Sequence, residues 1–418
     1  MAALPLACRT APSPIASGED TADTVAIRSD IVFLASDALE GRATGTAGND
    51  SAAAYIARRF HQLGLQPLAD GGFLQHFTAT SVAAAHSGMG SALPAQNVVA
   101  RLRGSDRNVA GEFVVVGAHF DHLGRSGFGA LDPTAKNEIR NGADDNASGT
   151  AAVLELARLL SRDPPRRSVV FVTFSGEELG LLGSQYFVRN PPVALNQVAA
   201  MINFDMVGRL RDDKVIVYGV ETATELPGIV DSSNIEPRLA IRAVGDGFGP
   251  SDHSSFYAQG IPVLHLFTDL HEDYHRAGDD ANKVNVAGEA RVIKFAERIV
   301  RAIANRPSRL TFVRSTAPAP VAPGSTSGYG AYLGTIPDMG AADVVGVRIT
   351  GVRADSPADQ AGLKAGDVIV EFAGTPIKDL YRYTDALRAH KPGEVVSIVV
   401  MRGAQRVELS ATLGARGR

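Results

Sequence analysis

Residues 141–149 read NGADDNASG and place two adjacent carboxylates, Asp144 and Asp145, in a turn bounded by glycines. An apolar run typical of a helix follows at once, over residues 150–160. Adjacent like charges repel each other unless a cation or strong donors lie between them, so this turn does little for a fold by itself. We therefore predict that Asp144 bridges two metal ions and that motifs on either side supply the remaining ligands.

The composition excludes several classes of protein. A length of 418 residues predicts two to three domains, and hydrophobic and charged fractions of 45% and 21% are those of an ordinary globular protein. A net charge of −4 gives no basic surface for nucleic acid, and no run approaches the roughly 18 apolar residues of a membrane span. We expect no nucleic-acid partner and no transmembrane span.

Cys8 is the only cysteine, which excludes an intrachain disulfide and a cysteine-based metal site. Any metal must then be bound by His, Asp and Glu. The residues up to Cys8 are apolar and end in small residues, as in a bacterial lipoprotein signal, but the basic start of such a signal is missing. We expect an extracytoplasmic protein (periplasmic, secreted or lipid-anchored through Cys8), with a start-site remnant as the alternative.

Apolar runs alternate with helical patterns along most of the chain. Continuous apolar runs are typical of strands buried on both faces of a sheet, and helices between them indicate a mostly parallel central sheet flanked by helices. The predicted strands lie at residues 97–103, 112–118, 168–174, 201–204, 214–218 and 261–267. The predicted helices lie at residues 27–34, 51–63, 150–160 and 290–305. The fold class is therefore α/β.

One stretch rich in Pro, Ala and Ser, residues 315–327, is the clearest domain boundary. It separates an α/β domain of residues 25–314 from a small β-rich domain of residues 328–413. Residues 1–24 are predicted to be a disordered lead-in or a signal remnant.

Acidic and imidazole side chains follow the predicted strands. Ligand sites in open α/β sheets form beyond the carboxyl ends of strands, so we expect these side chains to converge. Imidazoles and carboxylates without thiolates suit zinc, or less selectively manganese or cobalt, and a shared carboxylate permits two ions about 3.5–4 Å apart. The residues are His119, Asp121, Asp144, Asp145, Glu177, Glu178, Asp205 and His275.

Five motifs, in this order, resemble those of the M28 family of zinc aminopeptidases. They are GAHFDH at residues 117–122, GADDNASG at 142–149, SGEELG at 175–180, NFDM at 203–206 and YH at 274–275. The stretch LASDALEGR at residues 34–42 resembles the N-terminal segment of the family. The resemblance spans about residues 24–305 and implies a zinc-exopeptidase, phosphorylase/hydrolase-like fold.

The resemblance also implies a set of metal ligands. Asp144 would bridge two zinc ions. His119 and Asp205 would complete one site, and Glu178 and His275 would complete the other.

Three neighbouring carboxylates would support this set. Glu177 would be the general base and acid, and Asp121 would accept the other ring N–H of His119. A cis peptide would join Asp144 to Asp145, and Asp145 would stabilise the loop rather than bind a metal.

The chain departs from the family at Phe248, where many members carry a tyrosine that donates to the oxyanion. Phenylalanine has no donor. Either the ions stabilise the oxyanion alone, or Tyr274 or His253 takes the place of the tyrosine.

Two further motifs are not expected to act as the catalytic signatures that they resemble, and one histidine is expected to be structural. Residues 271–275 fit H-E-x-x-H, but Gly278 leaves hardly a turn of helix, so His271 is predicted to be a solvated loop or rim residue. The adjacent residues 251–253, Ser-Asp-His, cannot adopt the geometry of a catalytic triad, and Asp252 is predicted to support the site. His265, on an apolar strand, is predicted to belong to the core.

The C-terminal domain resembles a PDZ domain over about residues 328–413. A glycine turn enters a strand at residues 362–369, and residues 380–390 predict an amphipathic helix. The loop that would bind the carboxylate of a peptide C-terminus comprises Tyr332, Leu333, Gly334 and Thr335. The domain either recruits substrates or partners by their C-termini or is an inert spacer.

These observations predict a co-catalytic dizinc aminopeptidase that removes N-terminal residues from peptides. Three alternatives stay open: a carboxypeptidase or dipeptidase using the same site, a glutaminyl-cyclase-like acyltransferase with one zinc, and a non-catalytic peptide-binding adaptor. The complete ligand set argues against the cyclase, and an intact Glu177 argues against the adaptor.

Overall fold

The computed structural model of the chain describes most of both predicted domains. The predicted linker at residues 315–327 and Cys8, within the predicted lead-in, lie outside the described residues. The described residues are 21–69, 71–80, 92–125, 130–132, 135, 137–235, 238–314, 331–337, 344–352, 356–378 and 380–415.

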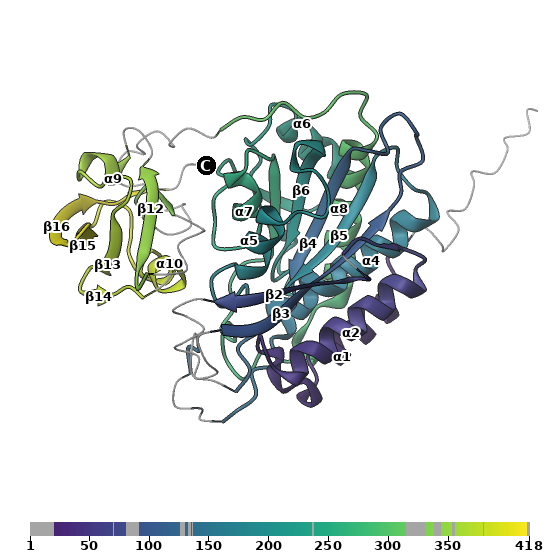
Figure 1. The fold of residues 1–418 in the computed structure, drawn as a ribbon, viewed down its shortest axis with the longest axis horizontal. Helices are drawn as coiled ribbons and strands as arrows, with labels where there is room; N and C mark the ends of the chain where they lie inside the picture. Colours follow the sequence, from purple (N-terminus) through teal and green to yellow (C-terminus); the bar gives the residue numbers. More distant parts are fainter. Residues whose placement is uncertain are drawn as a thin grey trace, which may run out of the picture.

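A nine-stranded sheet forms the centre of the first unit (Figure 1). Its strands are β1 (Gln66–Pro67), β2 (Leu74–Thr80), β3 (Ala92–Leu102), β4 (Phe113–His119), β5 (Ser168–Phe174), β6 (Val198–Phe204), β7 (Lys214–Tyr218), β8 (Ala240–Val244) and β9 (Val263–Phe267). Their order is β1-β3-β5-β4-β6-β9-β7-β8, and β2 pairs with β3. Strands β5, β4, β6 and β9 are neighbours and run parallel, so their carboxyl ends lie at one edge.

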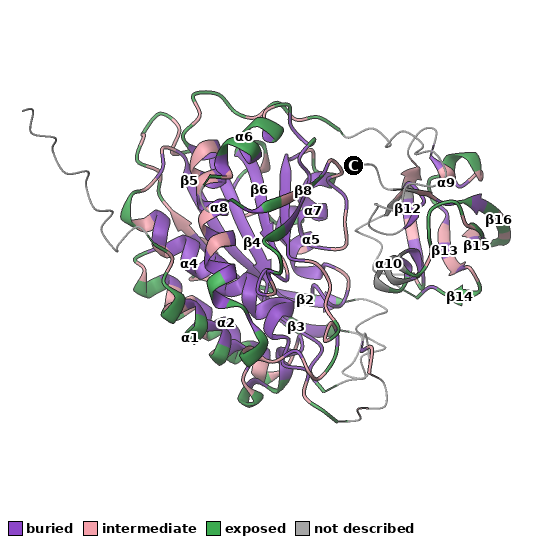
Figure 2. Cartoon of the chain, turned by 180° about the vertical axis from the view of Figure 1, so that it is seen from behind, coloured by how far each residue is buried: buried purple, intermediate pink, exposed green. Residues whose placement is uncertain are grey.

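Helices cover both faces of this sheet, which is therefore buried between them (Figure 2). The helices are α1 (Thr24–Leu34), α2 (Ala47–Gln62), α4 (Gly149–Arg162), α5 (Leu182–Arg189), α6 (Leu226–Ser233), α7 (His253–Ala258) and α8 (Val286–Ala304). Val114 of β4 belongs to the apolar cluster that includes α4 and α8, whereas Val115 belongs to the cluster that includes α5 and α7. The continuous apolar runs of the sequence are thus explained by burial on both faces.

Short helical segments lie between these elements. They are η1 (Asp37–Arg42), the kinked η2 (Ala143–Ser148), η3 (Leu195–Gln197) and η4 (Ala281–Lys283). Among the described helices, none is both long and apolar enough to cross a membrane.

The amphipathic pattern of the first predicted helix is confirmed by α1. Its side chains Ile27, Ile31 and Leu34 are buried against the core. The side chain of Asp23 accepts hydrogen bonds from the main-chain N–H groups of Val25 and Ala26, which satisfies two donors at the helix start.

The second unit has an antiparallel sheet in the order β11-β12-β13-β15-β16 and its own apolar core. The predicted helix at residues 380–390 is present as α10, with β11 at the edge of the sheet. The elements are β10 (Ala331–Tyr332), β11 (Thr335–Pro337), β12 (Val347–Val352), α9 (Pro357–Gln360), β13 (Val368–Phe372), β14 (Thr375–Pro376), α10 (Leu380–Ala389), β15 (Val395–Arg402), β16 (Gln405–Thr412) and β17 (Gly414–Ala415).

Candidate metal centre

Acidic and imidazole side chains converge at the carboxyl edge of the four central strands. His119 is the last residue of β4, Asp205 follows β6, and Glu177 and Glu178 follow β5. Three groups of potential ligand atoms each lie within 4.8 Å of one another. The groups are His119, Asp145 and Asp205; His122, Asp145 and Glu178; and His119, Glu177 and Glu178.

Asp145 lies between two imidazoles. Its Oδ1 is 3.3 Å from Nε2 of His119, and its Oδ2 is 3.2 Å from Nε2 of His275. Each imidazole also faces a second carboxylate: Asp205 Oδ1 is 3.4 Å from His119 Nε2, and Glu178 Oε2 is 3.3 Å from His275 Nε2. Each imidazole therefore faces two carboxylates, and the carboxylate of Asp145 is common to both imidazoles.

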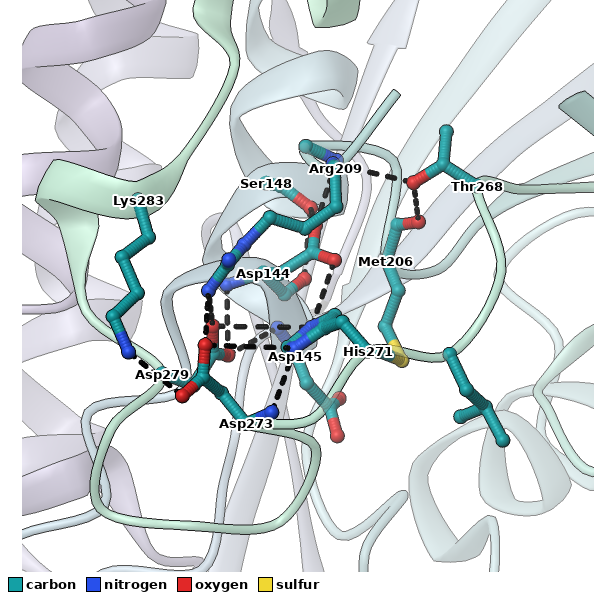
Figure 3. A network of polar contacts seen from close by, with 12 residues as sticks. Asp144, Asp145, Ser148, Met206, Arg209, Thr268, His271, Asp273, Asp279 and Lys283 are labelled. Atoms are coloured by element: carbon teal, nitrogen blue, oxygen red, sulfur yellow. Dashed lines mark hydrogen bonds and ion pairs between the residues drawn. The ribbon is translucent and has the colours of Figure 1, made fainter. Parts of the chain in front are cut away.

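The structure contradicts the predicted position of Asp144 between the two sites. Asp144 Oδ1 accepts hydrogen bonds from Gly208 N at 2.7 Å and Ser148 Oγ at 3.0 Å, and Oδ2 lies 3.2 Å from His271 Nε2 (Figure 3). The shared carboxylate is Asp145. Because η2 is kinked at Asp145, the two adjacent side chains contact different groups. Sequence alone does not say which of the pair faces the strand ends.

The predicted cis peptide is also displaced by one residue. It joins Asp145 to Asn146 rather than Asp144 to Asp145. The Asn146 side chain donates to Phe204 O at 3.0 Å and accepts from Gly149 N at 2.8 Å. The prediction that Asp145 stabilises the loop and that Asp144 takes the central place therefore has the two residues exchanged.

Asp121 lies behind His119, as predicted, but the carboxylate is not the closer acceptor. Nδ1 of His119 is 3.2 Å from the main-chain oxygen of Asp121 and 3.7 Å from its Oδ1. The Asp121 carboxylate accepts from the Thr44 hydroxyl at 2.9 Å and from Glu177 N at 3.2 Å. Asp121 thus fixes both the ring of His119 and the main chain of Glu177.

His122 was not among the predicted site residues. Its Nδ1 lies 2.8 Å from Glu178 Oε1, and its ring meets the ring of His275 edge-on at 5.8 Å between centroids. The available signal was its place in the motif at residues 117–122, three residues after His119.

The charged side chains of the cluster strongly shift one another's pKa values. Burial alone would lower the pKa of His119, but the carboxylates of Glu177 and Asp205 raise it well above its ordinary value. Burial alone would raise the pKa of Asp145, but hydrogen bonding to His119 and His275 lowers it well below the ordinary value. The carboxylate of Asp145 is therefore ionised.

The two adjacent glutamates differ in the same way. Burial, with added repulsion from Glu178 and Asp205, raises the pKa of Glu177 well above its ordinary value. Burial alone would raise the pKa of Glu178, but attraction to His275, together with hydrogen bonds to His122 and His275, lowers it to about 2. Glu178 is suited to bind a cation, whereas Glu177 is suited to exchange a proton.

These residues fit zinc. The ligand atoms are imidazole nitrogens and carboxylate oxygens, which zinc binds, and one carboxylate is placed to be shared between two ions.

A cavity opens beside the cluster. One side is formed by His119, Asp145, Glu177, Asp205 and His275. The remaining lining is mostly apolar or aromatic: Met206, Tyr218, Pro250, His265, Phe267, Leu270 and Tyr274. The cavity thus has charged groups on one side and a mostly apolar wall on the other.

Of the three residues considered for the oxyanion, Tyr274 lies in this cavity, where its ring stacks on that of His275 at 3.9 Å. Phe248 packs edge-on against Tyr257 at 4.7 Å, and His253 stacks on His265 at 4.4 Å. His265 is buried, as predicted, and it also lines the cavity.

The segment at residues 271–275 is a turn, as its sequence context indicated, and not the helix that a zincin needs. The prediction that His271 is solvated is wrong, because its side chain is only 4% exposed and faces Asp144. Asp252 is fully buried, and burial raises its pKa to about 7.

In the second unit, the predicted carboxylate-binding loop joins β10 to β11. Tyr332 and Leu333 are buried, and Gly334 has a φ of +89°. Thr335 Oγ1 lies 2.7 Å from the hydroxyl of Tyr383, which links β11 to α10.

The parallel α/β sheet and the carboxylate–imidazole cluster at its edge define an α/β protein with a candidate metal site. Comparison of the sequence with models of protein families identifies two matches. Residues 97–300 match the model of peptidase family M28, and residues 313–413 match that of the PDZ domain. Residues 97–300 therefore belong to peptidase family M28, and residues 313–413 belong to the PDZ domain family.

Known proteins agree with this assignment. The chain is 30% identical over 284 residues to leupeptin-inactivating enzyme 1 of Streptomyces exfoliatus, covering 67% of this chain and 56% of that protein. The chain thus spans little more than half of that relative's length.

Two solved structures share the fold. A zinc aminopeptidase of Bacillus subtilis matches with a TM-score of 0.55 at 16% identity, over 70% of this chain and 98% of its own. A glutaminyl cyclase of Porphyromonas gingivalis matches with a TM-score of 0.55 at 20% identity, over 68% and 99%. At these identities the likeness concerns the fold alone.

Proposed function

We propose that the protein is a co-catalytic dizinc aminopeptidase that removes N-terminal residues from peptides. The observation that carries this proposal is the position of Asp145, whose two oxygens face the imidazoles of His119 and His275 at 3.3 and 3.2 Å. A carboxylate so placed can be shared by two ions. The names of its relatives, which include aminopeptidases, support the same reaction class.

One zinc site would consist of His119, Asp205 and Asp145, and the other of His275, Glu178 and the same Asp145. Zinc bound there would polarise the scissile carbonyl and lower the pKa of a water molecule. Manganese or cobalt would fit the same ligand types less selectively.

Glu177 is the proposed general base. It lines the cavity, it is buried, and its Oε2 is 3.9 Å from His119 Nε2, at the outer limit of direct pairing. It would take a proton from the attacking water and return it to the leaving amine. Tyr274, beside His275 in the cavity, is the best-placed donor for the oxyanion in place of the missing tyrosine at Phe248.

The test combines zinc analysis with hydrolysis of a peptide that has a free amine and of its N-acetylated counterpart. The proposal predicts two zinc ions per chain, cleavage of the free peptide only, and a loss on the order of 10²–10⁴ in kcat for Glu177→Gln. Equal cleavage of the blocked peptide would reject the aminopeptidase. Conversion of an N-terminal glutamine peptide to its cyclic form without hydrolysis would favour the cyclase alternative.

For the second unit we propose recruitment of peptides by their C-termini. Among the described strands, β11 is at the end of its sheet, and a turn lies beside it at Gly334. Both features support this proposal, because PDZ domains add a peptide strand to a sheet edge.

A further inference from the structure

Asp279, a buried aspartate outside the proposed ligand set, accepts hydrogen bonds from the main chain of the acidic turn (Figure 3). Asp279 Oδ2 accepts hydrogen bonds from Asp144 N at 2.9 Å and from Asp145 N at 3.0 Å. Its main-chain oxygen accepts a third, from Ala143 N at 3.0 Å. Three consecutive N–H groups therefore end on one residue, which is fully buried.

Arg209 supplies a positive charge to this buried carboxylate and is closer to it than the ring of His271, whose Nε2 lies 4.0 Å from Asp279 Oδ1. Its Nη2 donates to Asp279 Oδ1 at 3.0 Å and to Asp273 Oδ2 at 3.2 Å. Lys283 Nζ lies at the outer end of the same chain of charges, 2.7 Å from Asp273 Oδ1. A buried carboxylate that loses its cationic partner is strongly destabilised, so Arg209 decides whether Asp279 keeps its place.

The residue before Arg209 acts on the same turn from the other side. Gly208 N donates to Asp144 Oδ1 at 2.7 Å, and Arg209 N donates to Thr268 Oγ1 at 3.2 Å. The segment after β6 thus contacts Asp144 directly and contacts the main chain of Asp145 through Asp279. The described lining of the cavity does not include Arg209, so a substrate there would not meet its side chain.

We propose that Arg209 is a positioning residue: acting through Asp279, it fixes the main chain of Asp145 so that this carboxylate lies between His119 and His275. The inference rests on the proposed zinc site. It goes beyond that site by assigning its geometry to a guanidinium group that touches neither the proposed ions nor the cavity.

The main test is zinc affinity, measured by competition with a chelator for wild type, Arg209→Met, Arg209→Lys and Lys283→Met. Loss of a group that orients a ligand typically costs 10–100-fold in metal affinity. Arg209→Met is expected to lose about that factor, and Arg209→Lys, which keeps the charge, to recover most of it. Lys283→Met is the matched control, because it removes a cation from the same network without touching Asp279, and it is expected to bind zinc as wild type does.

A second readout uses the zinc-free protein. Hydrogen exchange of the Asp144 and Asp145 amides, which donate to Asp279, is expected to be faster in Arg209→Met and normal in Lys283→Met. This measurement separates local positioning from a general loss of stability, which would speed exchange throughout the sheet.

The outcomes are distinguishable. Wild-type zinc affinity and amide exchange in Arg209→Met would overturn the inference while leaving the proposed function intact. An equal loss of zinc affinity in Arg209→Met and Lys283→Met would also overturn it. The loss would then come from removing any positive charge near the site and not from the contact of Arg209 with Asp279. A wild-type protein that binds no zinc would overturn the proposed function and this inference together.

Discussion

The guanidinium group of Arg42 donates a hydrogen bond to the main-chain oxygen of Gly142 at 2.9 Å, directly before the acidic turn. It also donates to Asn141 O, to Phe120 O at 2.8 Å and to Leu34 O at 2.6 Å, and it is fully buried. One side chain of the N-terminal segment therefore joins the end of α1, the loop after β4 and the turn that carries Asp145.

Replacing Arg42 with methionine is expected to destabilise the protein. Four buried carbonyl groups would lose a charged donor, and each unsatisfied group costs about 1–3 kcal/mol. We expect the free energy of unfolding in urea to fall by on the order of 3 kcal/mol or more. The control is Arg125→Met, because Arg125 is 47% exposed and pairs with the exposed Glu40. A loss no larger than that of the control would contradict this role for Arg42.

His122 is expected to support one of the two proposed zinc sites. Its ring contacts Glu178 at 2.8 Å and lies edge-on to His275. His122→Ala should weaken binding of one zinc by about 10–100-fold and leave the other largely unchanged, because only one site contains Glu178. Titration with zinc against a chelator gives both constants. His61→Ala, at an exposed position of α2, is the control, and identical titrations of the two variants would argue against the role of His122.

The stability of the first unit should depend on pH through Asp30. Burial raises the pKa of its carboxyl group to about 6, despite hydrogen bonds from Tyr55 and Arg59. Because this folded-state pKa lies above the unfolded value, the folded protein binds the extra proton between about pH 4 and 6, and stability falls as pH rises through that range.

The measurement compares wild type with Asp30→Asn by urea unfolding at several values of pH. The difference in unfolding free energy should change by roughly 2–3 kcal/mol between pH 4 and 7, in the direction that disfavours wild type at the higher pH. Asp163→Asn, at an 89% exposed side chain, should show no such change. If the difference in unfolding free energy between wild type and Asp30→Asn did not change with pH, the raised pKa of Asp30 would be disproved.

Gly334 is expected to be required for peptide binding by the PDZ domain. A Cβ added at Gly334 would lie 2.3 Å from Ser356 Cβ, and φ is +89°. Gly334→Ala should weaken binding of a peptide with a free C-terminal carboxylate by about tenfold or more, measured by fluorescence anisotropy. Gly374→Ala is the matched control: its φ is +77° with no atom within 4 Å of the added Cβ. If both variants bind as wild type does, the predicted loop is not the peptide site.

The sequence was most informative where burial imposes a pattern. The apolar runs at residues 112–118 and 168–174 correspond to β4 and β5, and strand ends correctly indicated where His119, Glu177 and Asp205 would converge. The short edge strands β1 and β8 were not predicted. Most of their residues are exposed or half-buried, so their sequences show neither an apolar run nor an alternation of apolar and polar residues.

The site was predicted less well where two candidates are adjacent in the chain. Asp144 and Asp145 have the same chemistry, and only the kink of η2 decides which of them faces His119. His271 was misjudged for a related reason: its partner Asp144 is distant in sequence, so nothing local indicates that its side chain is buried.

The central claim is that Asp145 is the carboxylate shared by two zinc ions. The most direct measurement is the number of zinc ions bound per chain in Asp145→Asn and Asp144→Asn, compared with wild type. We predict two zinc ions in wild type, fewer than two in Asp145→Asn, and two in Asp144→Asn, because Asp144 contacts Gly208, Ser148 and His271 instead. Two tightly bound zinc ions in Asp145→Asn, with a loss in Asp144→Asn, would contradict the account.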